Sequence, residues 1–212
     1  MNDNVKNILE WVYCIVIALV LALLFRYFIA TPTIVKQRSM FPTLKEEQRL
    51  ILNRTYRITK NYPKVGDVVT FESPSTKKSL YTAETADQSN PVAIYDEVNG
   101  PINKFFYNVL EVTKTSFIKR VIATEGQHVV IKDNTVYING KPLDESAYLA
   151  DDVVTESNVF NDFVVPEGYM FCMGDNRGKS TDCRVLGCIP IEKIEGIVVY
   201  RFWPLDVWGK IE

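Results

Sequence analysis

Histidine is nearly absent from this chain, since His128 is the only one among 212 residues. A Ser-His or Cys-His nucleophilic site would have to use that residue, and a metal site built from several histidines is excluded. If the chain is a hydrolase, we therefore expect its general base to be a residue other than histidine. We expect no metal and no other cofactor.

A basic arm or a cluster of Lys and Arg is also missing. The formal net charge is -2, and residues 1–32 add nothing to it, because Asp3 and Glu10 balance Lys6 and Arg26. Proteins that bind nucleic acid usually carry a concentrated positive surface. We therefore expect no nucleic-acid partner.

Cysteines with the close spacing of metal or redox sites are lacking, because no Cys-x-x-Cys occurs among the four cysteines. Cys14 lies in an apolar segment, whereas Cys172, Cys183 and Cys188 lie near one another toward the C-terminus. Three thiols cannot all pair with one another. We favour buried free thiols over a disulfide between two of these three.

One long apolar run is present. Residues 11–30 read WVYCIVIALVLALLFRYFIA and contain a single charge, Arg26. A helix of this length extends about 30 Å, the thickness of the hydrocarbon core of a bilayer. The run predicts a transmembrane helix over residues 11–31, preceded by a head of residues 1–10 and ending before Pro32.

A cleaved signal peptide and a buried globular helix are the alternative interpretations of this run. Ile29-Ala30-Thr31-Pro32 is a poor site for signal-peptide cleavage, which favours an anchor. Lys36, Arg38 and Lys45 follow the run, so the positive-inside rule does not support a C-terminal domain outside the cytoplasm. The orientation in the membrane therefore depends on the function.

The remainder, residues 32–212, is predicted to be a mainly β domain with one core and with inserted smaller β and loop regions. Short β-branched and aromatic runs alternate with turn residues, as is typical of strands. Hairpin turns are expected at Asp133-Asn134 and Asn139-Gly140, and a further break at Val165-Pro166-Glu167-Gly168. Residues 73–104 and 141–162 are expected to be insertions. The predicted strands are Arg49 to Asn53, Val68 to Phe71, Phe117 to Ala123, His128 to Lys132, Thr135 to Asn139, Phe163 to Met173 and Ile194 to Trp203.

A serine follows the anchor in the stretch RSMFPTL, residues 38–44. Pro42 fixes its own φ and favours an extended Phe41, so Ser39 is expected at a strand end or turn and not within a helix. That position suits a nucleophile, although most Ser-x-x-Pro segments are ordinary loops.

Lys119 lies in the predicted strand 117–123. Alternation places Phe117, Lys119 and Val121 on one face of this strand and Arg120 on the other. Partial removal from water would lower the pKa of the Lys119 ammonium and make the lysine a possible general base. The alternative is a lysine whose stem lies on an apolar face while its ammonium group reaches water.

The stretch from Met173 to Arg184 is dense in Gly, Asp, Asn and Arg. Such a composition predicts a tight turn held by side-chain hydrogen bonds and carboxylate–guanidinium pairs. A surface loop is one interpretation. The other is the floor of an active site, in which Ser180 orients a neutral lysine.

The combination of motifs resembles the bacterial type I signal peptidases, from the anchor to about Gly187. It consists of RSMFPTL at 38–44, GDVVTF at 66–71, FIKRVIA at 117–123 and VPEGYMFCMGDNRGKSTDCR at 165–184. The resemblance implies a membrane-bound serine endopeptidase with a Ser/Lys dyad, on an antiparallel β domain outside the cytoplasm. Its partners would be the lipid bilayer and exported preproteins, cleaved after Ala-x-Ala sites.

The resemblance also implies roles for individual residues. Ser39 would be the nucleophile, its backbone N–H would bind the oxyanion, and Lys119 would be the general base. Ser180 would orient Lys119, and Val35 and Met40 would line the substrate pockets. The residues expected to brace the site are Asp175, Arg177, Asp182 and Arg184.

Three positions depart from the family pattern. Gln37 stands where Ser, Thr or Gly is usual, so a second oxyanion donor is uncertain and the Gln37 amide is a candidate for it. Cys183 replaces a serine, which should affect packing. The run Thr124 to Gln127 replaces Pro-Gly-Asp, which should affect a turn only.

The anchor would keep the nucleophile near the membrane, because seven residues separate Pro32 from Ser39 and reach at most about 25 Å. Trp203, Leu205 and Trp208 are either a further membrane patch or part of the core. Two other functions remain open. One is an inactive membrane-tethered module of the same fold that assists surface-protein assembly, and the other is a self-cleaving Ser/Lys regulator, which an anchor disfavours.

Overall fold

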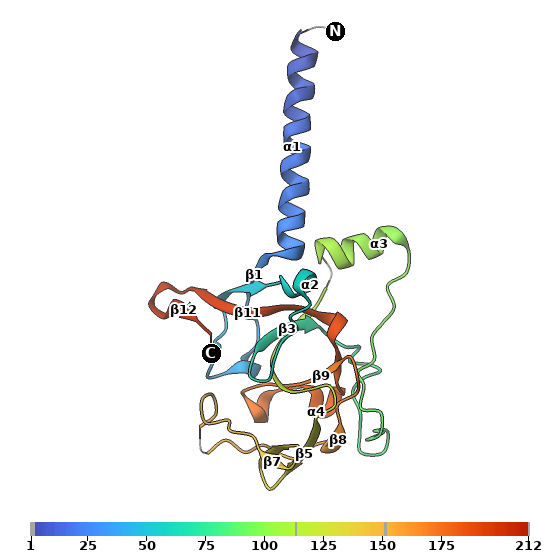
Figure 1. Cartoon of the computed structure of the whole chain (residues 1–212), viewed down its shortest axis with the longest axis vertical. Helices are drawn as coiled ribbons and strands as arrows, with labels where there is room; N and C mark the ends of the chain where they lie inside the picture. The colour runs from blue at the N-terminus through green and yellow to red at the C-terminus, as the bar shows by residue number, and fades with distance from the viewer. Residues whose placement is uncertain (1–2, 113, 151, 212) are drawn as a thin grey trace.

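A single helix projects from a β-rich body in the computed structural model, which describes residues 3–112, 114–150 and 152–211 (Figure 1). Helix α1 spans Asp3–Phe28, and its part Lys6–Phe28 is long and apolar enough to cross a membrane, with none of it buried in the body. The helix ends earlier than the predicted residue 31 because Ala30–Ile34 forms strand β1. The predicted head is helical from Asp3, and its residues 1 and 2 lie outside the described residues.

The larger sheet is antiparallel and joins segments from the whole chain. Its order is β1-β2-β11-β3-β4-β9-β10, and β12 pairs with β11. The strands are β1 Ala30–Ile34, β2 Arg49–Asn53, β3 Val68–Glu72, β4 Ser116–Thr124, β9 Tyr169–Met173, β10 Ile189–Pro190, β11 Ile194–Trp203 and β12 Gly209–Lys210.

The smaller sheet has the order β7-β6-β5-β8 and lies at the end of the body far from α1 (Figure 1). Its strands are β5 His128–Lys132, β6 Thr135–Ile138, β7 Lys141–Pro142 and β8 Asp162–Val164. Asp133, Asn134 and Asn139 have φ of 49°, 59° and 51°. These left-handed conformations are the ones that tight hairpin turns require, so both predicted turns are confirmed.

The mainly β prediction is confirmed. Strands β2, β5 and β11 have the predicted bounds, and β3, β4 and β6 differ at their ends by a residue. The predicted break at Val165 to Gly168 is confirmed, because it separates β8 from β9, which belong to different sheets. Pro166 lacks the backbone donor and Gly168 has a φ of 78°, so the chain turns between them.

Short helices complete the body. They are η1 Arg38–Met40, α2 Tyr56–Thr59, η3 Arg177–Lys179, α4 Cys183–Leu186, η4 Ile191–Lys193 and η5 Leu205–Val207. The first insertion leads into α3 Pro101–Phe105, which continues as the wider helical turn η2 Phe106–Leu110. It therefore extends beyond the predicted limit of residue 104.

Two apolar clusters form the core. The larger one contains Cys172, Cys183 and Cys188, and the cysteines of the described residues are free, as favoured from the sequence. The smaller cluster lies beneath η1 and includes Val35, Met40 and Leu44. Burial of Met40 and Leu44 on either side of Phe41 anchors the turn that carries Ser39.

Candidate active site

Ser39 and Lys119 are in direct contact, although 80 residues separate them in the chain. Lys119 Nζ donates a hydrogen bond of 2.7 Å to Ser39 Oγ. Ser39 is the middle residue of the short 3-10 helix η1 between β1 and β2, so the prediction that it lies outside a helix is wrong. Lys119 lies in the middle of β4. The tertiary structure therefore brings the predicted nucleophile and base within hydrogen-bond distance.

The environment of Lys119 favours a neutral amine. The residue is only 1% exposed, and its Nζ lies 5.1 Å from the centre of the Phe117 ring on the same face of β4. Burial lowers the pKa of Lys119 below its ordinary value, while the charges of Asp182 and Asp175 oppose that change. The alternative of an ammonium group that reaches water is wrong.

Hydrogen bonds from the loop after β9 fix the backbone around Ser39. Asn176 donates its backbone N–H to the Ser39 carbonyl at 3.0 Å and its side-chain amide to the Arg38 carbonyl at 3.0 Å. Gly174 lies against the same turn, and a Cβ at that position would collide with the Ser39 carbonyl oxygen and with Ser180 Oγ. Only glycine fits there without displacing the Ser39 turn.

Asp175 holds the lysine strand to this loop. Arg120, the neighbour of Lys119 on β4, donates Nε and Nη2 to the two Asp175 oxygens at 3.0 and 2.9 Å. Thr43 Oγ1 also donates to Asp175, at 2.6 Å. The sequence predicted that the carboxylates of the loop 174–184 pair with arginines of the same loop. Asp175 instead pairs with Arg120 of β4, which was not among the predicted site residues.

Asp182 and Arg184 form a second buried pair, as predicted. Arg184 donates Nε and Nη2 to the two Asp182 oxygens at 2.9 and 3.0 Å, and Gly174 donates its backbone N–H to Asp182 at 3.0 Å. A further bond of 2.6 Å runs from Arg184 Nη2 to the Arg177 carbonyl. The two residues thus fix the loop that supports Ser39.

Arg177 connects the site to the second insertion, residues 141–162. Its guanidinium donates to the Gly174 carbonyl at 3.1 Å, to Thr155 Oγ1 at 2.6 Å and to both carboxylate oxygens of Glu145. Glu145 and Thr155 were not predicted, and their residue types occur too widely along the chain to single them out.

Ser180 lies close to the dyad without contacting Lys119. Its Oγ is buried and has no hydrogen-bond partner among the residues that the structure describes. The predicted bond from Ser180 to Lys119 is therefore not formed in this conformation.

A groove of about 270 Å³ opens beside Ser39. Val35 and Met40, both 1% exposed, contribute to its lining, as does the exposed Gln37. The residues that line the groove are Thr33 to Gln37, Ser39, Met40, Thr70, Lys114 to Ser116 and Ile118. The predicted pocket residues and the candidate oxyanion donor thus lie in one groove with the nucleophile.

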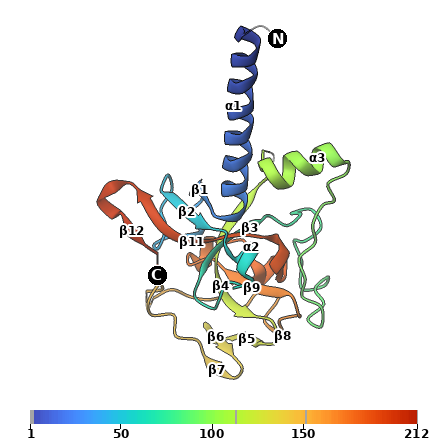
Figure 2. The same cartoon turned by 45° about the horizontal axis from the view of Figure 1, so that its top comes forward.

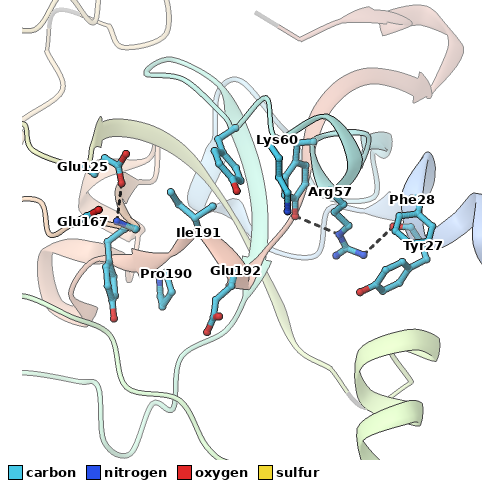
Figure 3. A pocket seen from close by; sticks show the side chains of 13 residues that line it. Tyr27, Phe28, Arg57, Lys60, Glu125, Glu167, Pro190, Ile191 and Glu192 are labelled. Atoms are coloured by element: carbon cyan, nitrogen blue, oxygen red, sulfur yellow. Dashed lines mark hydrogen bonds between the residues drawn. The ribbon is translucent and has the colours of Figure 1, made fainter.

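A larger cavity, of about 810 Å³, lies at the body end of α1 and contains neither Ser39 nor Lys119 (Figure 3). Arg57 crosses its α1 side, donating to the Tyr27 carbonyl at 3.0 Å and lying 4.5 Å from the centre of the Tyr27 ring. Figure 3 places Glu125 and Glu167 at the other end of the cavity. Among the described residues, no group of three or more His, Cys, Asp or Glu is arranged to hold a metal ion.

Comparisons with known proteins agree on one family. Residues 8–203 match the model described as signal peptidase, peptidase S26. The probable signal peptidase I-1 of Synechocystis sp. is 34% identical over 200 residues, covering 93% of this chain and 83% of that protein. Signal peptidase I of Bacillus licheniformis is 34% identical over 214 residues, covering 97% of this chain and 94% of that protein.

A solved signal peptidase I from Enterococcus faecalis V583 is also similar. It is 22% identical, with a TM-score of 0.38, and the match covers 64% of this chain and 96% of that one.

Proposed function

The chain belongs to the signal peptidase family, peptidase S26, as a serine endopeptidase that cleaves signal peptides from preproteins, and we propose that Ser39 is its nucleophile and Lys119 its general base. The observation that carries this proposal is the 2.7 Å contact between Lys119 Nζ and Ser39 Oγ. This distance lies within the range in which a proton can be transferred directly.

The reaction begins with neutral Lys119. As Ser39 Oγ attacks the scissile carbonyl, its proton passes to Lys119 Nζ, and the carbonyl oxygen becomes an oxyanion. The resulting Lys119 ammonium then protonates the leaving amine, which departs and leaves an acyl-enzyme on Ser39. Neutral Lys119 next accepts a proton from water as the resulting hydroxide attacks the acyl carbon. When the bond to Ser39 Oγ breaks, the Lys119 ammonium returns this proton to Oγ, which releases the acyl product and restores the Ser39 hydroxyl and the neutral amine.

The oxyanion requires hydrogen-bond donors in the groove. We assign the backbone N–H of Ser39 as one donor and the side-chain amide of Gln37 as the second. Gln37 precedes the nucleophile by two residues and lines the same groove. A donor of this kind typically contributes about 10²- to 10³-fold to the rate.

The Asp/Arg pairs have an electrostatic role in addition to a structural one. The carboxylates of Asp182 and Asp175 raise the pKa of Lys119 and so favour its inactive ammonium form. Arg184 and Arg120 neutralise these carboxylates through bidentate bonds. The pairs therefore support the loop and limit the extent to which the Asp182 and Asp175 charges raise the pKa of Lys119.

Ser180 is proposed to orient the Lys119 amine. Its buried Oγ lacks a partner among the described residues, and a buried hydroxyl without one is costly. In the proposed role, the Ser180 hydroxyl takes another of the three staggered χ1 positions of serine and bonds the Lys119 amine.

The groove accommodates the residues before the cleaved bond. Val35 and Met40 present apolar surface to a cavity of only about 270 Å³, which favours small side chains such as those of an Ala-x-Ala site. Signal-peptide-bearing preproteins are therefore the proposed substrates.

Helix α1 is proposed to cross the membrane once, with the catalytic body on the extracytoplasmic side. Exported preproteins present their cleavage sites on that side, where the catalytic body must lie to reach them. Lys36, Arg38 and Lys45 on the body side of α1 do not supply a charge argument for this orientation.

The test uses the full chain in detergent and a preprotein with an Ala-x-Ala site, with products identified by intact mass. Cleavage at that site by the wild type, and none by Ser39→Ala, Lys119→Ala or Lys119→Arg, is expected. Lys179→Arg, at an exposed position on η3, is the matched control and should cleave normally. Full cleavage by either Lys119 variant would exclude this base, and no cleavage by folded wild type would favour an inactive module.

A further inference from the structure

The helical segment Pro101–Leu110, formed by α3 and η2, stands outside the core. Ile102, Phe105 and Phe106 are 71%, 48% and 47% exposed. With Val109 they occupy positions i, i+3, i+4 and i+7, the spacing of an apolar stripe along one face of a helix. A helix of ten residues is marginally stable alone in water, so this segment requires a packing partner for its apolar face.

The segment lies beside the end of α1 that enters the body, as both Figure 1 and Figure 2 show. Val109 and the last turns of α1 line an apolar cavity of about 300 Å³ between the two helices. The residues of α1 in this lining are Val20, Leu23, Leu24, Tyr27 and Phe28. The apolar stripe of the segment is therefore continuous with the surface of the proposed membrane span.

A buried ionic contact fixes the end of this segment to the anchor. Glu111, directly after η2, accepts from Arg54 at 2.9 and 3.0 Å and from Arg26 of α1 at 3.2 Å. Burial opposes ionisation, but Arg54, Lys114 and Arg26 together hold the pKa of Glu111 below its ordinary value. Since Arg57 also binds the Tyr27 carbonyl, the body, α1 and the segment have a defined relative orientation (Figure 3).

We propose that the segment Pro101–Leu110 lies in the boundary between headgroups and acyl chains of the bilayer, as a second membrane contact beside α1. The occupant of its apolar face is lipid, because that face continues the apolar surface of α1 at the level where the span ends. Amphipathic helices of this kind insert their apolar face about 5–10 Å into the boundary. Lys104 belongs to the same segment outside the stripe and is exposed to interact with headgroups.

This contact has a consequence for the substrate groove and, in that respect, rests on the proposed function. Part of the groove lining, Thr33 to Gln37, follows α1 within a few residues, and another part, Lys114 to Ser116, follows the segment Pro101–Leu110. Short stretches of chain therefore connect both parts of the lining to the two proposed membrane contacts. A preprotein whose signal peptide is embedded in lipid would present its cleavage site at this position.

The first test measures lipid contact without using catalysis. Phe105→Cys is labelled with an environment-sensitive dye in a Cys14→Ser background, in which the remaining cysteines are buried. The full chain is then placed in vesicles of phosphatidylethanolamine and phosphatidylglycerol with brominated acyl chains. Val154→Cys, at a position 50% exposed in the second insertion, is the control.

We expect strong quenching of the dye at position 105 and little at 154. Equal, weak quenching at both positions would overturn the proposal. A third outcome would also overturn the proposal: weak quenching at position 105 together with dye emission typical of an apolar environment. If that emission depended on protein concentration, a second copy of the chain would cover the segment.

The second test separates the membrane contact from the chemistry. A variant carrying Ile102→Asn, Phe105→Asn and Phe106→Asn should lose about tenfold or more in kcat/KM on a preprotein embedded in vesicles, because position relative to the bilayer sets effective concentration. Cleavage of a short soluble peptide in detergent should be unchanged. Equal activity of variant and wild type on the embedded preprotein would overturn the groove argument. Failure of the wild type on both substrates would instead contradict the proposed function, and the dye measurement would still stand.

Discussion

Arg120 and Asp175 form a bidentate pair that joins strand β4 to the loop after β9 across 55 residues of sequence. Both side chains are almost fully buried. Lys119 precedes Arg120 on the strand, and Asn176, which binds the Ser39 carbonyl, follows Asp175 in the loop. The pair therefore connects the residues that carry the base to those that hold the nucleophile.

Asp175→Ala should destabilise the protein by about 3–5 kcal/mol, because it leaves the Arg120 guanidinium buried without its principal counter-charge. Denaturant unfolding of the full chain in detergent measures this change. The double variant Arg120→Met with Asp175→Leu should recover most of the loss, since both charges are removed together. A double variant as unstable as Asp175→Ala would contradict the pairing argument.

Gly174→Ala should reduce both stability and activity, since the added methyl group collides with Ser180 Oγ and the Ser39 carbonyl oxygen. Overpacking of this kind costs about 1–3 kcal/mol. Gly178→Ala is the matched control in the same loop, because a Cβ there meets no atom within 4 Å. Thermal unfolding and kcat/KM of the two variants would be compared, and equal behaviour would mean that Gly174 is not constrained by these contacts.

The pH dependence of activity should report the lowered pKa of Lys119. Only the neutral amine accepts the Ser39 proton, so kcat/KM should rise as the pH increases through that lowered pKa and then level off. Phe117→Gln lets water approach the amine, which raises the pKa and should move the rising limb to higher pH. Leu80→Gln, at an exposed position outside the groove lining, should leave the limb in place. A profile unchanged by Phe117→Gln would show that burial beneath this ring does not set the pKa.

The same group predicts how stability changes with pH. The unfolded chain holds the Lys119 proton up to an ordinary pKa of 10.5, whereas the folded chain releases it at lower pH. Between these two values the unfolded state binds more protons, so the free energy of unfolding should rise with pH in that window. Lys119→Met should remove this part of the dependence, as measured by denaturant titrations at several pH values, and an unaltered slope would contradict the assignment.

Gln37→Ala should lower kcat by about 10²- to 10³-fold with little change in KM, if the Gln37 amide stabilises the oxyanion. Gln37→Ser, which restores a donor, should recover part of the rate. Burst kinetics with an ester substrate would show whether acylation is the affected step. Normal kcat in Gln37→Ala would assign the second donor to another group, with Ser39 and Lys119 unaffected.

Much of the secondary structure was predictable because it depends on local patterns. Alternation along 117–123 placed Lys119 on the face of Phe117, and the structure agrees because successive side chains of a strand point to opposite faces. The apolar run predicted a helix, but its end at Phe28 was missed, since Ala30–Ile34 pairs with Arg49–Asn53 and this pairing outweighs local preference. The break at Val165 to Gly168 was predictable from its turn residues, but the pairing of β8 and β9 with strands of different sheets was not, because it depends on long-range contacts.

The sequence by itself determined which residues are candidates for chemistry, through motifs that supply a serine, a lysine and an Asp/Arg-rich loop in a fixed order. Only the tertiary structure decided how they meet: Lys119 donates to Ser39, Asp175 pairs with Arg120, and Ser180 Oγ stays without a partner among the described residues. It also decided that Pro101–Leu110 lies beside α1. These contacts join segments that are far apart in the chain. Their spacing in the sequence does not specify them, because long-range packing and the need to pair buried charges determine which side chains meet.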